Sequence, residues 1–350
     1  MRIGLAVGAG GMGGSSLEPL LVVPEAERLG YDSVWVGEAY GADAVSALGW
    51  LAGRTERIRL GSSILQMPAR TPAMTAMSAA GLDQLSGGRL LLGLGTSGPQ
   101  VAEGWHGVAF DRPLGRSREY VAIVRAALAR ETVRFEGEHF RLPLPDGPGK
   151  ALKLATRPVQ DPVPIYLAAM GPKNTELVGE VADGWLPILF RPESSGYFTE
   201  LLEKGAARSG RDAAQVAVTP MVSILVTEEG PQAVAAGRDA MRPFLALYVG
   251  GMGSRERNFY LNLVAEYGFE ANARAVQDHY LAGRKQEAEA LLSDELIDAV
   301  TVVGPPAAVR ERLAAYAEAG VDTLVYTKPH GLSDDAHRDQ LRLVAEAAQG

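Results

Sequence analysis

The sequence has no cysteine among its 350 residues. This absence excludes disulfide bonds, thiolate metal sites and a cysteine nucleophile, and it fits a reducing compartment such as the cytoplasm. Basic residues are not in excess either, because 34 lysines and arginines stand against 42 aspartates and glutamates, for a formal net charge of −8. Since nucleic acids are bound through clustered cations, we expect no nucleic-acid partner.

Long hydrophobic runs are missing as well. No apolar stretch approaches the ~18 residues of a membrane-spanning helix, and the chain passes from Met1 into a predicted strand without the apolar segment of a secretion signal. We therefore expect a cytoplasmic protein that does not enter membranes. The patterns of a zinc protease, a P-loop and a hydrolase nucleophile elbow are also absent, so we expect neither a metal site nor serine hydrolysis.

What the sequence does contain is a regular alternation of apolar strands with helices, and 47% of its residues are hydrophobic. Continuous apolar runs are typical of parallel strands that are covered on both faces. Eight are predicted: Arg2–Val7, Ser33–Val36, Arg59–Leu65, Arg89–Leu94, Ile165–Ala169, Trp185–Leu189, Val216–Val226 and Thr323–Tyr326. Eight strand–helix units predict an α/β fold of the (β/α)8 TIM-barrel type, with an open doubly wound sheet as the alternative. We expect one domain over residues 1–350, with a mostly helical insertion at about 231–292.

Small polar residues and glycines mark where the predicted helices begin and end. Asp43 and Thr71 precede helical segments and are expected to cap them, because their side-chain oxygens can accept hydrogen bonds from free amides. Ser16 is expected to cap the first helix in the same way. Gly320 is expected to end the helix before the last strand, and the pattern over Phe135–Leu142 predicts an extra hairpin.

Two loops that follow predicted strands are rich in small residues. The first is Gly95-Thr96-Ser97-Gly98, and glycine allows such a backbone to approach an anion closely while the hydroxyls donate to it. The second is Ala168-Ala169-Met170-Gly171, which precedes a helix from about Asn174 whose free amides and dipole suit a negative charge. Each loop alone could be a simple turn. Together they predict a site that holds one phosphate from two sides.

A glycine cluster, Gly8-Ala9-Gly10-Gly11-Met12-Gly13, matches the dinucleotide-binding fingerprint after a first strand. That fingerprint needs a helix that begins within the glycines, whereas the helix predicted here begins beyond Ser16. Glu38 also lies 30 residues after Gly8, further than the usual ~20 for a ribose-binding acid. A nicotinamide Rossmann enzyme stays an alternative, but a pliable loop at the mouth of a barrel is favoured.

Few polar side chains are placed for chemistry. Glu38 follows a strand at the end where barrel enzymes hold their catalytic groups, although a helix cap or an ion-pair partner would look the same. His106 follows the Gly95–Gly98 loop and is a candidate for proton transfer. Tyr326 and His330 end the last strand and are expected to reach the mouth of the barrel.

Several motifs together resemble the luciferase-like monooxygenase superfamily, over about residues 2–328. They are Trp35-Val36-Gly37-Glu38, Leu60-Gly61-Ser62-Ser63-Ile64, Leu85-Ser86-Gly87-Gly88-Arg89, Leu92-Gly93-Leu94-Gly95-Thr96-Ser97-Gly98 and Ala182-Asp183-Gly184-Trp185. The two small-residue loops are most similar to the branch that uses the deazaflavin coenzyme F420, which includes methylenetetrahydromethanopterin reductase and F420-dependent glucose-6-phosphate dehydrogenase.

The resemblance implies a cofactor site, residue by residue. A non-prolyl cis peptide at Ser63-Ile64 would support the back of the deazaflavin ring, and the two loops would contact its phosphate. The cofactor-binding residues implied are Glu38, Ser62, Ser63, Ile64, Gly95, Thr96, Ser97, Gly98, Val101, Ala168, Ala169, Met170, Gly171 and Asn174. Glu38 takes the place of an aspartate near the ring in the sugar-phosphate enzyme. The histidine that follows that aspartate is Ala39 here, so sugar-phosphate oxidation is not expected.

The function that follows from the resemblance is hydride transfer between the deazaflavin C5 and a small organic substrate, with Glu38 handling the proton and His106 or Tyr40 as alternatives. One rival is an FMN-dependent monooxygenase that works with a partner reductase, because FMN also carries a phosphate. Another is a flavin-binding barrel without catalytic activity. Relatives of this kind pair through their early helices, which implies a homodimer.

Overall fold

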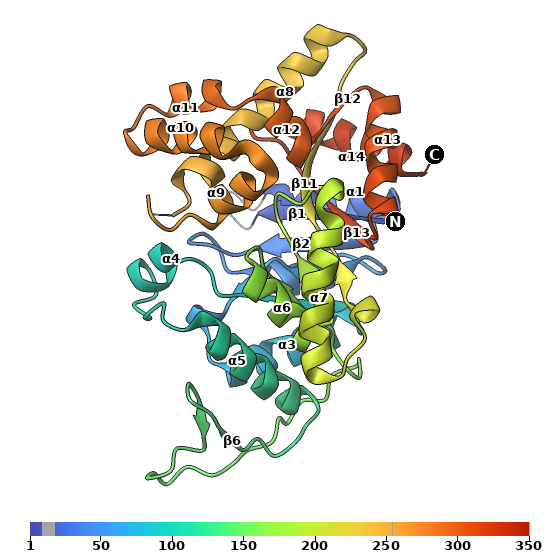
Figure 1. Cartoon of the computed structure of the whole chain (residues 1–350). Coiled ribbons are helices and arrows are strands. Elements are labelled where there is room, and N and C mark those ends of the chain that lie inside the picture. The colour runs from blue at the N-terminus through green and yellow to red at the C-terminus, as the bar shows by residue number, and fades with distance from the viewer. Residues whose placement is uncertain (9–17, 254, 350) are drawn as a thin grey trace.

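The computed structural model describes residues 1–8, 18–253 and 255–349, and a parallel sheet forms the centre of the molecule with helices around it (Figure 1). The strands of the central sheet are β1 (Arg2–Gly8), β2 (Ser33–Gly37), β3 (Arg59–Ser62), β4 (Leu65–Gln66), β5 (Leu90–Gly95), β8 (Ile165–Ala168), β9 (Gly184–Leu186), β10 (Ala217–Val218), β11 (Met221–Val226), β12 (Val302–Gly304) and β13 (Thr323–Thr327). Strands β6 (Phe135–Glu136) and β7 (Arg141–Leu142) form the predicted hairpin.

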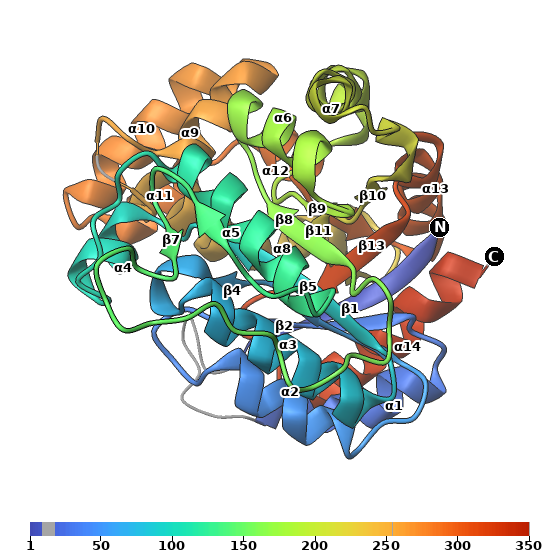
Figure 2. The same cartoon turned by 90° about the horizontal axis from the view of Figure 1, so that it is seen from below.

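Helices connect these strands and lie outside them (Figure 2). They are α1 (Val23–Arg28), α2 (Ala44–Ala52), α3 (Pro72–Ser86), α4 (Pro99–Gly104), α5 (Pro113–Leu128), α6 (Pro172–Val181), α7 (Ser195–Ser209), α8 (Pro231–Ala246), α9 (Phe259–Val264), α10 (Glu270–Leu281), α11 (Lys285–Leu291), α12 (Asp294–Val300), α13 (Pro306–Glu318) and α14 (Asp334–Gln349). Within the described part of the chain, no helix combines the length and the apolar character that crossing a bilayer requires.

The sheet closes on itself. Its strand order is β10-β9-β8-β5-β3-β2-β1-β13-β11-β12, and β10 runs directly into β11 along the chain. The closing contacts are a bridge between Ile188 and Met221 and a hydrogen bond from the Thr219 amide to the Trp185 carbonyl at 2.9 Å. The TIM barrel is therefore confirmed and the open doubly wound sheet is wrong. The fold that a nicotinamide Rossmann enzyme would need is absent from the described residues.

The barrel interior is filled by a small core of large side chains. Its buried members are Trp35, Leu91, Tyr166, Leu186 and Val325, one from each of five strands. The rings of Trp35 and Tyr166 meet edge to face, with centroids 5.1 Å apart. Glycine makes room for both, because a Cβ on Gly61 would overlap the Trp35 ring and a Cβ on Gly184 would overlap the Tyr166 ring. The interior is thus packed and carries no channel.

Alternate residues of β13 face the barrel interior and the outer helices. The expectation that Tyr326 reaches the mouth of the barrel is therefore wrong. Val325 points into the barrel, so Tyr326 points outward, where it is fully buried and lies 6.0 Å from the ring of His337 on α14. Tyr326 does not reach the mouth. The hydroxyl of Tyr326 and Nε2 of His337 are both buried, and neither has a hydrogen-bond partner in the described structure.

The predicted helix ends are mostly confirmed. Asp43 accepts a hydrogen bond from the Ser46 amide at 2.8 Å, and Thr71 accepts one from the Met74 amide at 3.2 Å. Gly320 follows α13 with a positive φ of 83°. The first helix begins later than expected, at Val23 after a 3-10 turn, and Ser16 lies outside the described residues.

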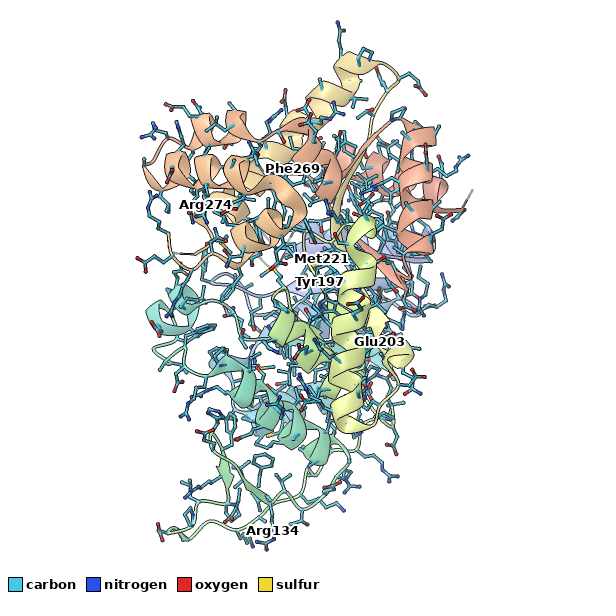
Figure 3. All side chains as sticks on the ribbon, viewed as in Figure 1. Arg134, Tyr197, Glu203, Met221, Phe269 and Arg274 are labelled. Carbon is cyan, nitrogen blue, oxygen red and sulfur yellow. The ribbon has the colours of Figure 1, made fainter. Side chains whose placement is uncertain are left out.

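Most of the described residues between 231 and 300 are helical, and their helices lie together at one end of the molecule, whereas the β6–β7 hairpin extends from the other end (Figure 1). The helical segment contains a π-helical turn at Leu247–Gly251 and a kink within Ala265–Phe269, where Gly268 has a positive φ of 94°. In Figure 3, Phe269 and Arg274 mark this segment, and Arg134 lies just before the hairpin. The segment is inserted between β11 and the last β–α unit of the barrel, so it is placed beyond the carboxyl ends of the strands.

Candidate active site

The peptide bond between Ser63 and Ile64 is cis, as the resemblance implies. It lies between β3 and β4, at the carboxyl end of the third strand of the barrel. Strand register brings this point next to the ends of two other strands, since Leu65 pairs with Leu94 and Leu94 pairs with Leu167. Three separate sequence motifs therefore meet at one place.

At this place Ile64, Gly95 and Ala168 form an apolar surface that we name the Ile64 patch. A Cβ on Gly95 would lie 2.7 Å from Cδ1 of Ile64 and 3.5 Å from Cβ of Ala168. Glycine at position 95 therefore allows the Ile64 side chain to lie against β5. Ile64 and Ala168 both pack on the interior core of the barrel, so the Ile64 patch forms the top of that core.

The two serines before the cis bond are held by the sheet. The buried hydroxyl of Ser62 donates to the Gly93 carbonyl at 2.8 Å and accepts from the Gly93 amide at 2.9 Å, so its hydrogen-bonding capacity is used inside the protein. The Ser63 amide donates to the Val36 carbonyl at 2.8 Å. Ser62 consequently fixes the strand, and its hydroxyl is not free to contact a ligand.

The loop after β5 keeps polar groups available. Thr96, Ser97 and Gly98 are half-buried, and Ser97 has a positive φ of 58°, which is uncommon for a residue other than glycine. The Thr96 hydroxyl donates to the Ser97 carbonyl at 3.3 Å. The Gly98 carbonyl accepts from the Val101 amide at 3.1 Å and begins the short helix α4.

The loop after β8 is anchored from below. Nε1 of Trp185 donates to the carbonyl of buried Ala169 at 2.9 Å. Gly171 caps α6 through its carbonyl, which accepts from the Asn174 amide at 3.0 Å, and a Cβ on Gly171 would meet no atom within 4 Å. Met170 is half-buried beside it. This loop therefore presents open space and backbone at the start of a helix, as the sequence predicts.

Glu38 lies directly after β2 and is held by an ion pair that the sequence did not reveal. Both guanidinium nitrogens of Arg70 donate to its carboxylate, at 2.6 and 2.7 Å. The amides of Gln66 and Ala44 donate as well, at 3.1 and 3.3 Å. The Glu38 side chain is only 7% exposed, and its hydrogen bonds to Arg70 raise the pKa of that guanidinium. With four donors on two oxygens, the carboxylate acts here as an ion-pair partner.

His106 joins the same network through Gln66. The buried side chain of Gln66 donates from Nε2 to the Ala39 carbonyl at 2.7 Å, and its Oε1 lies 3.1 Å from Nε2 of His106. The structure thus brings Glu38 and His106 together, linked by Gln66 and without direct contact. In the sequence, Gln66 is only a polar residue directly after the predicted strand Arg59–Leu65, and Arg70 only precedes the expected cap Thr71, so neither is marked as part of a site.

Aromatic side chains from the helical segment lie near Tyr40, which follows Glu38 by two residues. The ring of Tyr248 contacts Phe244 in a tilted arrangement, with centroids 4.4 Å apart, and Tyr260 edge to face, with centroids 4.7 Å apart. Burial raises the pKa of Tyr248 to about 12, and the nearby phenol of Tyr40 adds to the rise. Tyr40 and Trp105 are themselves 58% and 66% exposed. Of the glycine cluster, Gly8 ends β1 and positions 9–13 lie outside the described residues.

A closed parallel barrel that gathers its polar groups at the carboxyl ends of the strands is the architecture of TIM-barrel enzymes. The chain belongs to the luciferase-like monooxygenase family, whose model matches residues 13–323.

Two relatives and one solved structure show what the chain is similar to. A putative coenzyme F420-dependent oxidoreductase of Mycobacterium tuberculosis is 43% identical over 334 residues, which cover 93% of this chain and 95% of that protein. A 5,10-methylenetetrahydromethanopterin reductase of Methanolobus tindarius is 30% identical over 87% of this chain and 88% of its own length. The structure of the coenzyme F420-dependent tetrahydromethanopterin reductase from Methanopyrus kandleri superposes with a TM-score of 0.80 over 99% of this chain and 97% of that one; at 22% identity this likeness demonstrates the shared fold.

Proposed function

We propose that this protein is a coenzyme F420-dependent oxidoreductase that transfers a hydride between the deazaflavin C5 and a small organic substrate. The relative at 43% identity, which spans nearly the whole chain, is named for the same coenzyme. The observation that carries the proposal is the Ile64 patch, an apolar surface at the mouth of the barrel that lies between two loops rich in glycine and small residues. Such a surface suits the face of a fused ring, and the loops suit its phosphate.

The residues present fit this coenzyme. Thr96 and Ser97 offer hydroxyls and amides on one side, and the backbone around Met170 and Gly171 offers the start of a helix on the other side. The remaining implied residues, Ser62, Ser63, Gly98, Val101, Ala169 and Asn174, would shape these loops. When bound, the coenzyme supplies or accepts the hydride, and the protein holds the reacting carbons close together and excludes water.

We assign the accompanying proton to His106 and not to Glu38. Glu38 already accepts four hydrogen bonds and is shielded by Arg70. His106 is half-buried, and an imidazole has one nitrogen that can give a proton and one that can take it. Glu38 would instead hold Arg70 and the Gln66 backbone in place beneath the coenzyme.

The substrate class is a small molecule with a C=C, C=O or C=N bond, which accepts a hydride at one atom and a proton at the other. The test is turnover of the reduced coenzyme with a panel of substrates, one for each bond type. The readout is the absorbance of the oxidised coenzyme, which returns as the reduced form is consumed. A parallel reaction with reduced FMN and oxygen represents the monooxygenase alternative. Turnover with F420 in the absence of oxygen supports the proposal, and oxygen-dependent turnover with FMN alone contradicts it.

We also propose that two copies pair through α2 and α3. The large apolar side chains Trp50, Met74, Met77 and Leu85 on these helices are between 37% and 68% exposed. Asp83 is the one charged residue of α3, and it is buried. A helix whose exposed face carries methionine and leucine but no charge fits an interface better than open solvent.

A further inference from the structure

Gln66 has a side-chain amide that is buried at the mouth of the barrel, and both its nitrogen and its oxygen make hydrogen bonds. It is 1% exposed, its Nε2 donates to the Ala39 carbonyl, and its Oε1 faces Nε2 of His106. Because the Ala39 carbonyl can only accept, the orientation of the Gln66 amide is fixed, and its Oε1 can only accept. His106 must therefore carry a hydrogen on Nε2.

This hydrogen determines what the other ring nitrogen can do. With Nε2 donating to Gln66, the neutral imidazole of His106 keeps its lone pair on Nδ1. Among the residues that the structure describes, no hydrogen-bond partner is found for Nδ1, whereas the His106 amide is bonded to the Val101 carbonyl at 3.1 Å. Nδ1 is thus the nitrogen left to exchange a proton with a substrate.

Gln66 is also tied to the surface on which the reaction is placed. Gln66 pairs in register with Gly95, a member of the Ile64 patch. The backbone amide of Gln66 donates to the Glu38 carboxylate at 3.1 Å. Glu38 is in turn held by Arg70, whose carbonyl accepts from the Tyr120 hydroxyl at 3.2 Å. A rigid chain of contacts therefore places the His106 imidazole one side chain away from the Ile64 patch.

We propose that Gln66 is a positioning residue that holds His106 so that Nδ1 gives the proton as the hydride reaches the substrate. The inference rests on the proposed function. In the reducing direction, the bound coenzyme would supply the hydride for one atom of the double bond, and the His106 imidazolium would give its Nδ1 proton to the other atom. The imidazole then stands as its Nε2–H form, which is the form that Gln66 stabilises, and solvent returns the proton to Nδ1.

The first test detects the hydrogen bond between Gln66 and His106 in the absence of coenzyme and substrate. In protein labelled with 15N-histidine, His106 is expected to give an Nε2–H signal that is protected from exchange with water, and His106→Gln assigns this signal among the five histidines. The signal should disappear in Gln66→Met, which keeps the size of the side chain and removes the acceptor. It should persist in Gln66→Glu, which retains an acceptor oxygen, and in Gln232→Met, an exposed control on α8. A wild-type signal that is absent, or that survives in Gln66→Met, overturns the inference.

The second test separates positioning from general support of the site. We expect Gln66→Met to lower kcat at least tenfold and His106→Gln to lower it about 100-fold, with the dissociation constant for F420 within threefold of wild type. The double variant should be no slower than His106→Gln alone, because Gln66 acts through His106. A further loss in the double variant, or weaker coenzyme binding that accounts for the slower rate, contradicts the inference. If the wild type binds no F420 while the histidine signal behaves as stated, the proposed function fails and the Gln66–His106 pairing stands.

Discussion

At the scale of single residues, the partner of a charged group decides what that group can do. Glu38 lies at the place where barrel enzymes hold catalytic carboxylates, yet Arg70 donates to it twice and two amides donate as well. The pair is almost enclosed, with 15% of the Arg70 side chain and 7% of the Glu38 side chain exposed. Removing one partner would leave a buried charge without compensation.

We therefore expect Arg70→Met to lower the free energy of unfolding by about 3–5 kcal/mol. Replacing both charges, in Glu38→Gln with Arg70→Met, should recover part of this loss because no unpaired charge remains. The exposed Arg274, which pairs with Glu270 on α10, is the matched control, and Arg274→Met should cost less than about 1 kcal/mol. Urea unfolding of the wild type and the three variants measures these differences. Equal losses for Arg70→Met and Arg274→Met would contradict the role given to the pair.

The buried imidazole of His337 is expected to make the stability of the fold depend on pH. Burial lowers its pKa from 6.5 to about 4, and the positive charge of Lys328 contributes to the decrease. The unfolded chain binds a proton on this residue below about pH 6.5, while the folded protein does not until about pH 4. Stability is therefore lost as pH falls through this window, by an amount on the order of 3 kcal/mol. Unfolding free energies at pH 7 and pH 4.5 should differ less in His337→Gln than in wild type, and an unchanged difference would show that His337 does not titrate in this way.

At the scale of helices and strands, local patterns were sufficient wherever a segment is covered on both sides. The eight barrel strands are continuous apolar runs bounded by glycine or polar residues, so their positions could be predicted within a few residues. The helix caps at Asp43 and Thr71 could be predicted from side-chain chemistry alone. In contrast, the three-residue strand β12 is too short for a local pattern to reveal it. The helix α14 was not predicted although its buried residues recur at helical spacing, and it is held by distant contacts such as the hydrogen bond from the Val226 amide to Gln340 at 2.8 Å.

The sequence predicts the loops of the candidate site but does not reveal the polar network beside them. Two loops of small residues after neighbouring strands together predict a phosphate site, although each alone could be a simple turn, whereas the cis bond at Ser63-Ile64 was implied only by the family resemblance. Gln66 and Arg70 acquire their roles from partners 28 to 40 residues away in sequence, so no motif marks them.

The packing of the strands against one another gives a test at this scale. A Cβ at Gly61 would overlap the buried Trp35 ring, so Gly61→Ala should destabilise the barrel by about 1–3 kcal/mol. Gly196 on α7 is the control, since a Cβ there meets no atom within 4 Å. Gly196→Ala is expected to raise stability by up to about 1 kcal/mol because alanine favours a helix. Thermal unfolding of the two variants should shift in opposite directions, and a neutral Gly61→Ala would show that the interior is less tightly packed than described.

At the scale of the whole molecule, three surface features surround the barrel. The helical segment of residues 231–300 lies beyond the carboxyl ends of the strands, where the candidate site is. The β6–β7 hairpin lies against α5, on the opposite side of the molecule from this segment (Figure 1), and α2 and α3 leave an apolar face. The hairpin is joined to α5 by Glu119, whose carboxylate accepts from the amides of Glu138, His139 and Phe140. Neither the hairpin nor the apolar face contributes to the Ile64 patch.

We expect the protein to be a dimer in solution, with α2 and α3 at the interface. Met77→Arg places a charge on the exposed face of α3 and should convert the dimer to a monomer, because a charge is costly inside an apolar interface. Leu281→Arg, on an exposed position of α10, is the control and should leave the dimer intact. Light scattering coupled to size exclusion gives the mass directly. A wild-type monomer, or dissociation by the control alone, would contradict the proposed interface.

The central claim is that the mouth of this barrel binds a deazaflavin coenzyme at the Ile64 patch. The most direct measurement is a fluorescence-quenching titration of the purified protein with coenzyme F420, with FMN and NADPH titrated in parallel. Our account predicts saturable binding of F420 that is at least tenfold tighter than binding of either other ligand. Tighter binding of FMN, or no saturation by F420, would contradict it.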